Sequence, residues 1–151
     1  MNTYAYVGGN PVSHIDPYGL WRFPDYASVN VNIALPNPWT ATLVGWSGSI
    51  SVDRYGDWYW SPIGAGVGKS ATIFSASATI NWLDQCIKPT QRKLDDFLSA
   101  NGFNATIGFF GGVSQSYTPG TGMATGVGVV TPQAGASYNY SFKGGNLGFS
   151  W

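Results

Sequence analysis

Two long stretches of this chain carry no charged side chain, and this restricts the folds that it can adopt. No Asp, Glu, Lys or Arg occurs in residues 26–52 or 97–142. Charged residues make up 9% of the sequence, whereas an ordinary soluble domain contains about 25%. Within both stretches apolar and polar residues alternate, for example over 28–35 and 137–142. Such alternation is typical of β-strands that present one apolar face.

Turn-forming residues divide the chain into about eight predicted strands. They cover residues 28–35, 40–53, 58–64, 70–82, 105–117, 122–131, 137–142 and 147–151. We expect the last two to form a terminal hairpin through the glycine pair between them. Glycines inside several strands indicate bends or bulges rather than a flat sheet. The pattern predicts a mainly β fold, an antiparallel β-barrel or strongly curved sheet of about eight strands with one short helix.

The short helix is predicted where the charges gather. Thr90 can cap its first turn, and Leu94, Phe97 and Leu98 follow helical spacing up to Asn101-Gly102. At 151 residues the chain fits one folded domain with a workable core. We expect the helix to sit over one end or flank of the barrel.

The first twenty residues differ in kind from the rest. They contain Asn-Thr-Tyr-Ala-Tyr-Val-Gly-Gly-Asn-Pro at 2–11 and Asp-Pro-Tyr-Gly-Leu at 16–20. These two pieces resemble the closing motif of an Rhs (YD-repeat) core, which is followed in that family by a variable toxin. The resemblance implies that residues 1–20 end the Rhs-associated core. It also implies that residues 21–151 form the variable C-terminal domain of a polymorphic toxin.

The same resemblance implies how the toxin is released. The parent protein would cut itself after Leu20, with Asp16, Pro17, Gly19 and Leu20 in the self-cleavage motif. An earlier Asp-Pro-x-Gly of the family motif would lie upstream of Met1, so we expect this chain not to cleave itself. The toxin would enter competing cells as part of a larger Rhs protein, without a signal peptide of its own. Its expected partners are the parent Rhs cage, a cognate immunity protein and, for a membrane-active toxin, the target-cell membrane.

The residue inventory excludes most familiar catalytic systems. The chain has no Glu, and its one histidine, His14, lies in the Rhs-like leader. This removes Ser-His-Asp and Cys-His nucleophile systems, His-based metal sites and Glu-dependent ADP-ribosyl transfer. Cys86 is the only cysteine and has no His to activate it. Because the seven basic residues are balanced by seven acidic ones, we expect no nucleic-acid binding. We also expect no cofactor and no metal.

Asp53, Arg54 and Asp57 surround a predicted hairpin tip. They could bind a cation or polarise a substrate, but Asp and Gly also favour turns at such positions, and we interpret them as turn residues. If the protein were an enzyme, these three and Lys69 would be the catalytic candidates.

The run Gly-Ala-Gly-Val-Gly-Lys-Ser at 64–70 resembles a phosphate-binding loop. It lacks the first Gly at the required spacing and is followed by a strand pattern, so we interpret it as a glycine-rich strand edge.

Aromatic residues, at 16% of the chain, are the remaining candidates. Trp58 and Trp60 lie on one face of a predicted strand, and core filling is our default interpretation for such a pair. The alternative is that Trp58, Trp60, Tyr138, Tyr140 and Trp151 face a membrane or a ligand.

Three functions of the protein stay open. The first is a toxin tip that perturbs membranes, which the missing His and Glu favour. The others are a soluble β-barrel enzyme that uses Asp, Arg and Lys, and a module that binds glycan or protein.

Overall fold

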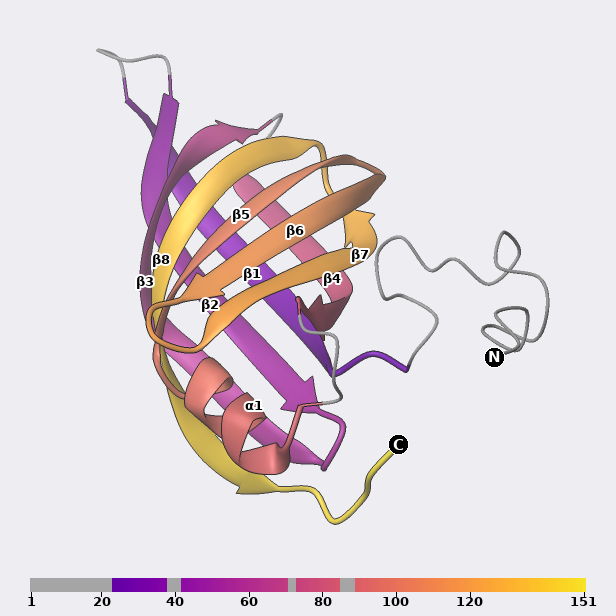
Figure 1. Ribbon diagram of the computed structural model, residues 1–151. Helices are drawn as coiled ribbons and strands as arrows, with labels where there is room; N and C mark the ends of the chain where they lie inside the picture. The colour runs from indigo at the N-terminus through magenta and orange to yellow at the C-terminus, as the bar shows by residue number, and fades with distance from the viewer. Residues whose placement is uncertain (1–22, 38–41, 71–72, 85–88) are drawn as a thin grey trace, which may run out of the picture.

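A computed structural model describes residues 23–37, 42–70, 73–84 and 89–151. Its strands close into one antiparallel barrel (Figure 1). In chain order the elements are β1 (Tyr26–Asn37), β2 (Thr42–Asp53), β3 (Asp57–Ser70), β4 (Phe74–Leu83), α1 (Gln91–Leu98), β5 (Asn101–Phe109), β6 (Gly111–Thr118), β7 (Gly122–Val130) and β8 (Gln133–Asn146). The predicted fold class, an antiparallel barrel of about eight strands with one short helix, is confirmed. The Rhs-like residues 1–20 and Cys86 lie outside the described residues.

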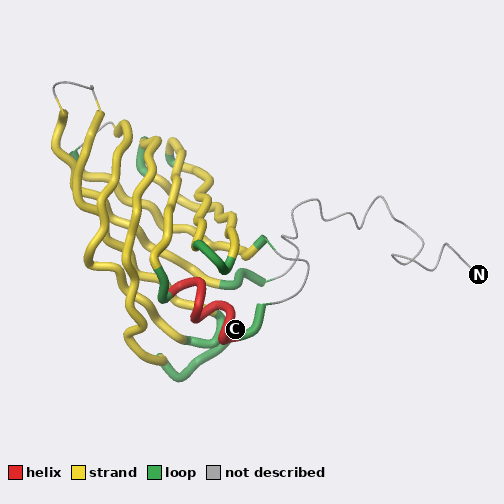
Figure 2. Tube along the Cα trace, turned by 60° about the vertical axis from the view of Figure 1, so that its left-hand side comes forward, coloured by secondary structure: helices red, strands yellow, loops and turns green. Residues whose placement is uncertain are grey.

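The strands do not follow one another around the barrel in chain order. The order is β1-β2-β3-β8-β5-β6-β7-β4, and β4 pairs again with β1. Strands β1 to β3 and β5 to β7 are neighbours in sequence, whereas β4 reaches β5 through α1. Figure 2 shows that α1 lies across one end of the barrel, which we call the helix end. We call the opposite end, where residues 131–132 join β7 to β8, the far end.

The helix end holds the hydrophobic core of the molecule. Thr90 caps α1, and its Oγ1 accepts a hydrogen bond from the Lys93 N–H at 3.4 Å. The helix spans eight residues, and its Leu94, Phe97 and Leu98 are buried. They pack against a cluster from the strands: Tyr26, Tyr59, Leu83 and Ala124. The helix predicted from Thr90 is thus confirmed over one barrel end, although Asn101 and Gly102 begin β5 rather than end the helix. In the described part of the chain, no helix has the length and apolarity to cross a membrane.

The predicted terminal hairpin is wrong. Strand β8 instead continues to Asn146 and stays paired with β3. A Cβ on Gly144 would collide with the Trp58 ring, so that glycine serves a close approach inside a strand rather than a turn. The last residues cross the helix end, where the Trp151 N–H donates to the carbonyl oxygen of Arg54 at 3.0 Å.

The single strand predicted over 105–117 is also wrong, because these residues belong to a hairpin. Strands β5 and β6 pair from Phe103 opposite Tyr117 to Phe109 opposite Gly111. The chain reverses at Phe110, whose φ is 66°. A left-handed conformation is rare for an aromatic residue, so Phe110 itself gave no signal of a turn, although Gly111 and Gly112 directly follow it.

Candidate functional site

The outer face of the barrel is apolar. Among the described residues, large hydrophobic side chains are exposed at 28 positions, and only nine hydrophobic residues form the buried core. Every strand contributes to the exposed set, for example through Val29, Ile50, Ile63, Ile80, Ile107, Val113, Val127 and Tyr138. Soluble proteins bury most residues of these types. Large exposed apolar patches mark contacts with another molecule or with lipid.

The inner face of the barrel is polar. Small hydroxyl and amide side chains are buried there, among them Asn30, Ser47, Ser61, Ser75, Ser77, Thr79, Asn81, Ser114 and Asn139. They satisfy one another. Ser47 donates to the Asn139 Oδ1 at 2.6 Å, and Ser114 donates to the Asn81 Oδ1 at 3.2 Å. Buried polar groups require such partners. The barrel is therefore polar inside and apolar outside, the reverse of a soluble barrel.

Inward-facing glycines leave room for these polar pairs. A Cβ on Gly64 would collide with the side chains of Asn139 and Ser47. A Cβ on Gly126 would collide with the side chain of Asn81. Gly64 also lies inside β3, which runs through the whole phosphate-loop-like segment. That segment is a strand, so it does not form a phosphate-binding loop.

The aromatic candidates lie mainly on the outer face. Trp60 is 44% exposed and Tyr59, the residue before it, is 1% exposed. Core filling is therefore the wrong interpretation for Trp60, and the core residue of this strand is Tyr59. The Trp60 and Phe142 rings lie 6.2 Å apart, and the Tyr140 and Phe142 rings lie 4.7 Å apart. These rings form a patch across β3 and β8.

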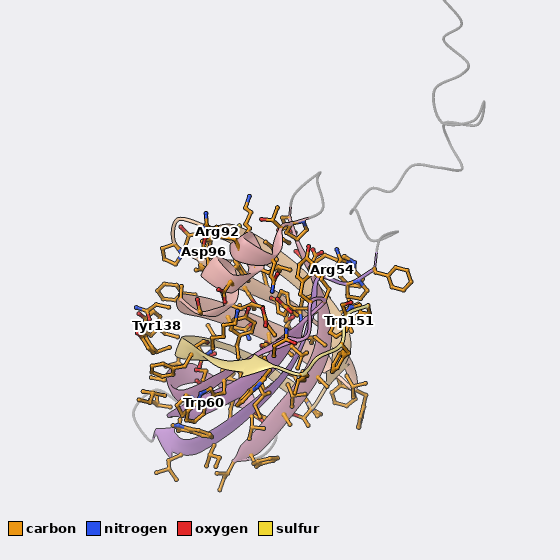
Figure 3. All side chains as sticks on the ribbon, turned by 90° about the horizontal axis from the view of Figure 1, so that it is seen from below. Arg54, Trp60, Arg92, Asp96, Tyr138 and Trp151 are labelled. Atoms are coloured by element: carbon orange, nitrogen blue, oxygen red, sulfur yellow. The ribbon has the colours of Figure 1, made fainter. Side chains whose placement is uncertain are left out.

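The other aromatic candidates surround this patch. Tyr138 is exposed, and its ring centroid lies 5.0 Å from that of Phe103 on β5. Trp58 is half-buried beside Gly144. Trp151 is exposed beyond the end of β8 and stacks with Phe149 at 5.7 Å. Figure 3, which views the barrel from the helix end, shows Trp60 and Tyr138 on the outside of the wall and Trp151 near Arg54.

Charged side chains are confined to the two ends of the barrel. Lys69 lies toward the far end of β3. The other charged residues that the structure describes belong to α1 or to strand ends and turns near it: Asp25, Asp53, Arg54, Asp57, Asp84, Arg92, Lys93, Asp95, Asp96 and Lys143. Figure 3 shows Arg92 and Asp96 on α1 and Arg54 to one side of it. The wall between the ends is uncharged within the described residues.

A buried ion pair fixes the chain ahead of β1 to the β2–β3 turn. Arg54 and Asp25 approach to 3.0 Å, and their side chains are 3% and 0% exposed. The Arg54 Nη2 also donates to the carbonyl oxygens of Phe23 and Pro24, at 3.0 and 3.1 Å. The other oxygen of Asp25 accepts from the Leu83 N–H at 2.9 Å. Because both charges are buried away from water, removing either one would leave the other without compensation and would destabilise the fold.

A second cluster ties α1 to the barrel wall around Asp57. This carboxylate accepts hydrogen bonds from Gln91 at 2.9 Å, from Lys143 at 2.9 Å and from Asn146 at 2.7 Å. Lys143 also pairs with Asp95 of α1 at 3.2 Å. Burial acts to raise the pKa of Asp57, but the three hydrogen bonds outweigh burial and hold the pKa below its usual range. The cluster lies at the turn on the helix end, beyond the uncharged wall.

The four catalytic candidates are not brought together. Asp53 serves its own turn, since its Oδ1 accepts from the N–H groups of Tyr55 and Asp57, both at 2.9 Å. Burial raises the pKa of Asp53 despite these bonds. Arg54 is bound in the buried ion pair. Lys69 is exposed at the opposite end of β3 from Asp57. Nor does any group of three His, Cys, Asp or Glu side chains that could hold a metal ion occur among the described residues.

The sequence interpretation missed Asp25, Asp95 and Lys143 as members of these clusters. Lys143 lies 86 positions after Asp57 in the chain, so no local spacing joins them. The one available signal was the crowding of charges around the predicted helix.

Comparisons with protein family models, with curated proteins and with solved structures find no match to this chain.

Proposed function

We propose that this barrel embeds in a lipid bilayer. The observation that carries the proposal is the inverted distribution of polarity: side chains that face outward are apolar, and those that face the lumen are largely Ser, Thr and Asn. Lipid tails cannot hydrogen-bond a strand edge, so a membrane sheet must close on itself, as this one does. Alternating apolar-out and polar-in strands are the pattern of transmembrane barrels.

The dimensions of the strands agree with this proposal. A tilted strand needs about 9–11 residues to cross the hydrocarbon core. The strands here contain between 8 and 14 residues. The aromatic patch around Trp60 and Phe142 lies near the helix end of the wall, and membrane barrels carry aromatic girdles at their interfaces. The charged helix end would stay in water.

Two other functions are less well supported. An enzyme needs polar groups that converge on a substrate, but Asp53 and Arg54 are engaged in structural contacts and Lys69 is remote from both. A sugar site needs polar side chains beside its stacking rings. Trp60 instead packs near Phe142 on an apolar wall. The bilayer accounts for the whole outer surface, whereas a local site accounts for a small part of it.

Within this class of membrane barrel, we propose that the chain is the toxin tip of an Rhs-type protein. This step rests on the leader at 2–11 and 16–20 and on its resemblance to the end of an Rhs core. The tip would be delivered into competing bacteria and would harm them by entering their membranes. An immunity protein in the producing cell would neutralise it.

Flotation with lipid vesicles tests the bilayer proposal. The full chain, refolded from denaturant in the presence of phospholipid vesicles, should float with them in a density gradient and resist extraction by alkaline carbonate. Ile63→Arg places a charge on the outer wall and should reduce the floating fraction, whereas the matched control Ile63→Leu should not. A wild-type chain that stays in the aqueous fraction as a folded monomer would contradict the proposal.

The toxin proposal has a separate test in cells. Bacteria that produce the full chain with an export signal should stop growing, and Ile63→Arg should relieve this effect while Lys69→Ala should not. The opposite result, in which killing persists in Ile63→Arg and disappears in Lys69→Ala, would favour an enzyme. Unimpaired growth with the folded wild-type chain in the envelope would refute the toxin role.

A further inference from the structure

Two of the cavities bordered by described residues lie inside the barrel, and both have polar and apolar side chains in their lining. The upper cavity, toward the far end, has a volume of about 60 Å³ and includes Ser75, Thr106 and Gln133 in its lining. The lower cavity also measures about 60 Å³ and lies above α1, with Ser116 and Phe97 in its lining. A water molecule occupies about 30 Å³ of liquid. Each cavity is therefore large enough to hold water.

The two cavities meet at one pair of amides. Asn30 and Asn104 border both of them. The Asn104 Nδ2 donates to the Asn30 Oδ1 at 3.4 Å, and the Asn30 Nδ2 donates to the Ser77 Oγ at 3.4 Å. Both distances exceed the usual 2.7–3.2 Å range of N–H···O bonds, so these are weak bonds that water can replace. The Asn30–Asn104 pair is the narrow point between the cavities.

Two polar atoms beside the upper cavity have no hydrogen-bond partner among the described residues. They are the Asn104 Oδ1 and the Gln133 Nε2, and both are buried. One is an acceptor and the other is a donor. Leaving both unpaired would cost free energy, and water satisfies such atoms in polar cavities of this size. Both atoms therefore indicate that the lumen is hydrated.

The lining of the cavities favours uncharged molecules. Among the described residues, no Asp or Arg borders either cavity, and the one Lys in their linings, Lys69, is exposed on the outer side of β3. An ion that entered would lose its hydration without gaining an opposite charge, which is costly. At the lower end, the small residues Ala100 and Gly102 border the cavity beside α1, and bulkier side chains there would reduce its volume.

We infer that water and small uncharged solutes cross the membrane through this lumen, past the Asn30–Asn104 pair, and that ions do not. The inference rests on the proposed insertion into a bilayer. It assigns the permeability to the interior of one barrel, without a ring of several copies. Ser, Thr and Asn side chains replace part of the hydration of a neutral solute along the path, and Phe97 and Leu98 of α1 line its lower part.

Osmotic shrinkage of vesicles tests this inference on the full chain. Vesicles that contain the inserted barrel should shrink faster than protein-free vesicles after a sucrose shock, while their potassium permeability should stay at the protein-free level. Ser75→Cys, in a Cys86→Ser background, places a thiol in the upper cavity. Modification of that thiol with benzyl methanethiosulfonate should abolish the whole excess rate of shrinkage.

Ala78→Cys is the matched control, because residue 78 is on the same strand but exposed on the outer wall. Its modification should leave the rate unchanged. The inference is overturned if inserted wild-type barrels add no water permeability, if potassium passes as well, or if modified Ser75→Cys vesicles keep the excess rate. It is also overturned if mass spectrometry shows that the Ser75→Cys thiol does not react. Flotation of the same samples separates these results from a failure of insertion, which would refute both proposals.

Discussion

The helix end and the wall of this barrel are organised in opposite ways. At the helix end, Leu94 and Phe97 are buried against strand residues, and charges such as Asp57 and Lys143 pair around them. Along the wall, the large apolar side chains are outside and the small polar ones are inside. The helix end follows the rules for a protein in water, whereas the wall follows the rules for lipid. The contrast teaches that one short chain can carry two opposite distributions of polarity.

The largest loss of stability is expected from a substitution that breaks the buried ion pair at the helix end. Arg54→Ala would leave the buried Asp25 carboxylate without its charged partner, which lowers the free energy of unfolding by about 3–5 kcal/mol. Urea unfolding followed by tryptophan fluorescence measures it. The control Arg92→Ala removes an exposed arginine from α1 and should change the stability by less than about 0.5 kcal/mol. Equal effects of the two substitutions would show that this end is not organised around the pair.

A charge introduced on the outer wall tests whether lipid surrounds the apolar side chains there. Val127 faces outward near the middle of β7. In vesicles, Val127→Arg should destabilise the barrel by about 2–4 kcal/mol, as arginine does near the midplane of membrane barrels. The control Val127→Leu keeps the surface apolar and should be near neutral. If Val127→Arg is as stable as Val127→Leu in vesicles, then lipid does not surround the wall.

A smaller loss of stability is expected when a hydrogen-bonded side chain inside the lumen is removed. Asn139→Ala removes the acceptor for Ser47 and the donor to Ser137. The buried partners left behind should lower the free energy of unfolding by about 1–3 kcal/mol. Asn101→Ala, at an exposed position of β5, is the control and should have little effect. A lumen that tolerates both equally would not depend on its internal hydrogen bonds.

The smallest effect concerns pH at the helix end. The pKa of Asp57 is depressed in the folded chain, so its contribution to stability is present above the pKa of the unfolded chain. It is lost as the pH falls through the lower, folded value. Asp53, with a raised pKa, acts in the opposite sense. We expect the wild type to lose stability relative to Asp57→Asn between about pH 5 and pH 2. A constant difference across this range would mean that Asp57 is not held by Lys143 and its neighbours.

Much of the fold could be predicted from local patterns. Alternation marked the strands, and Thr90 with Leu94 and Phe97 marked the helix. The hairpin at Phe110 was missed because no turn-forming residue occupies its left-handed position. The terminal hairpin was predicted wrongly because glycines such as Gly144 read as a turn, although this one makes room for Trp58. In both places the requirement came from a partner strand rather than from the residue itself.

The sequence by itself determined that this chain has two-faced strands, a charge-poor wall and one capped helix, because these properties follow from neighbouring residues. It left open which face is inside, as Trp60 illustrates. Only the tertiary structure decided that the small Ser, Thr, Asn and Gly residues line the lumen, since the interior of a closed barrel of eight strands has little volume. The structure also decided the pairing of β3 with β8 and of Asp57 with Lys143. Such contacts depend on the closure of the whole sheet, which no local spacing encodes.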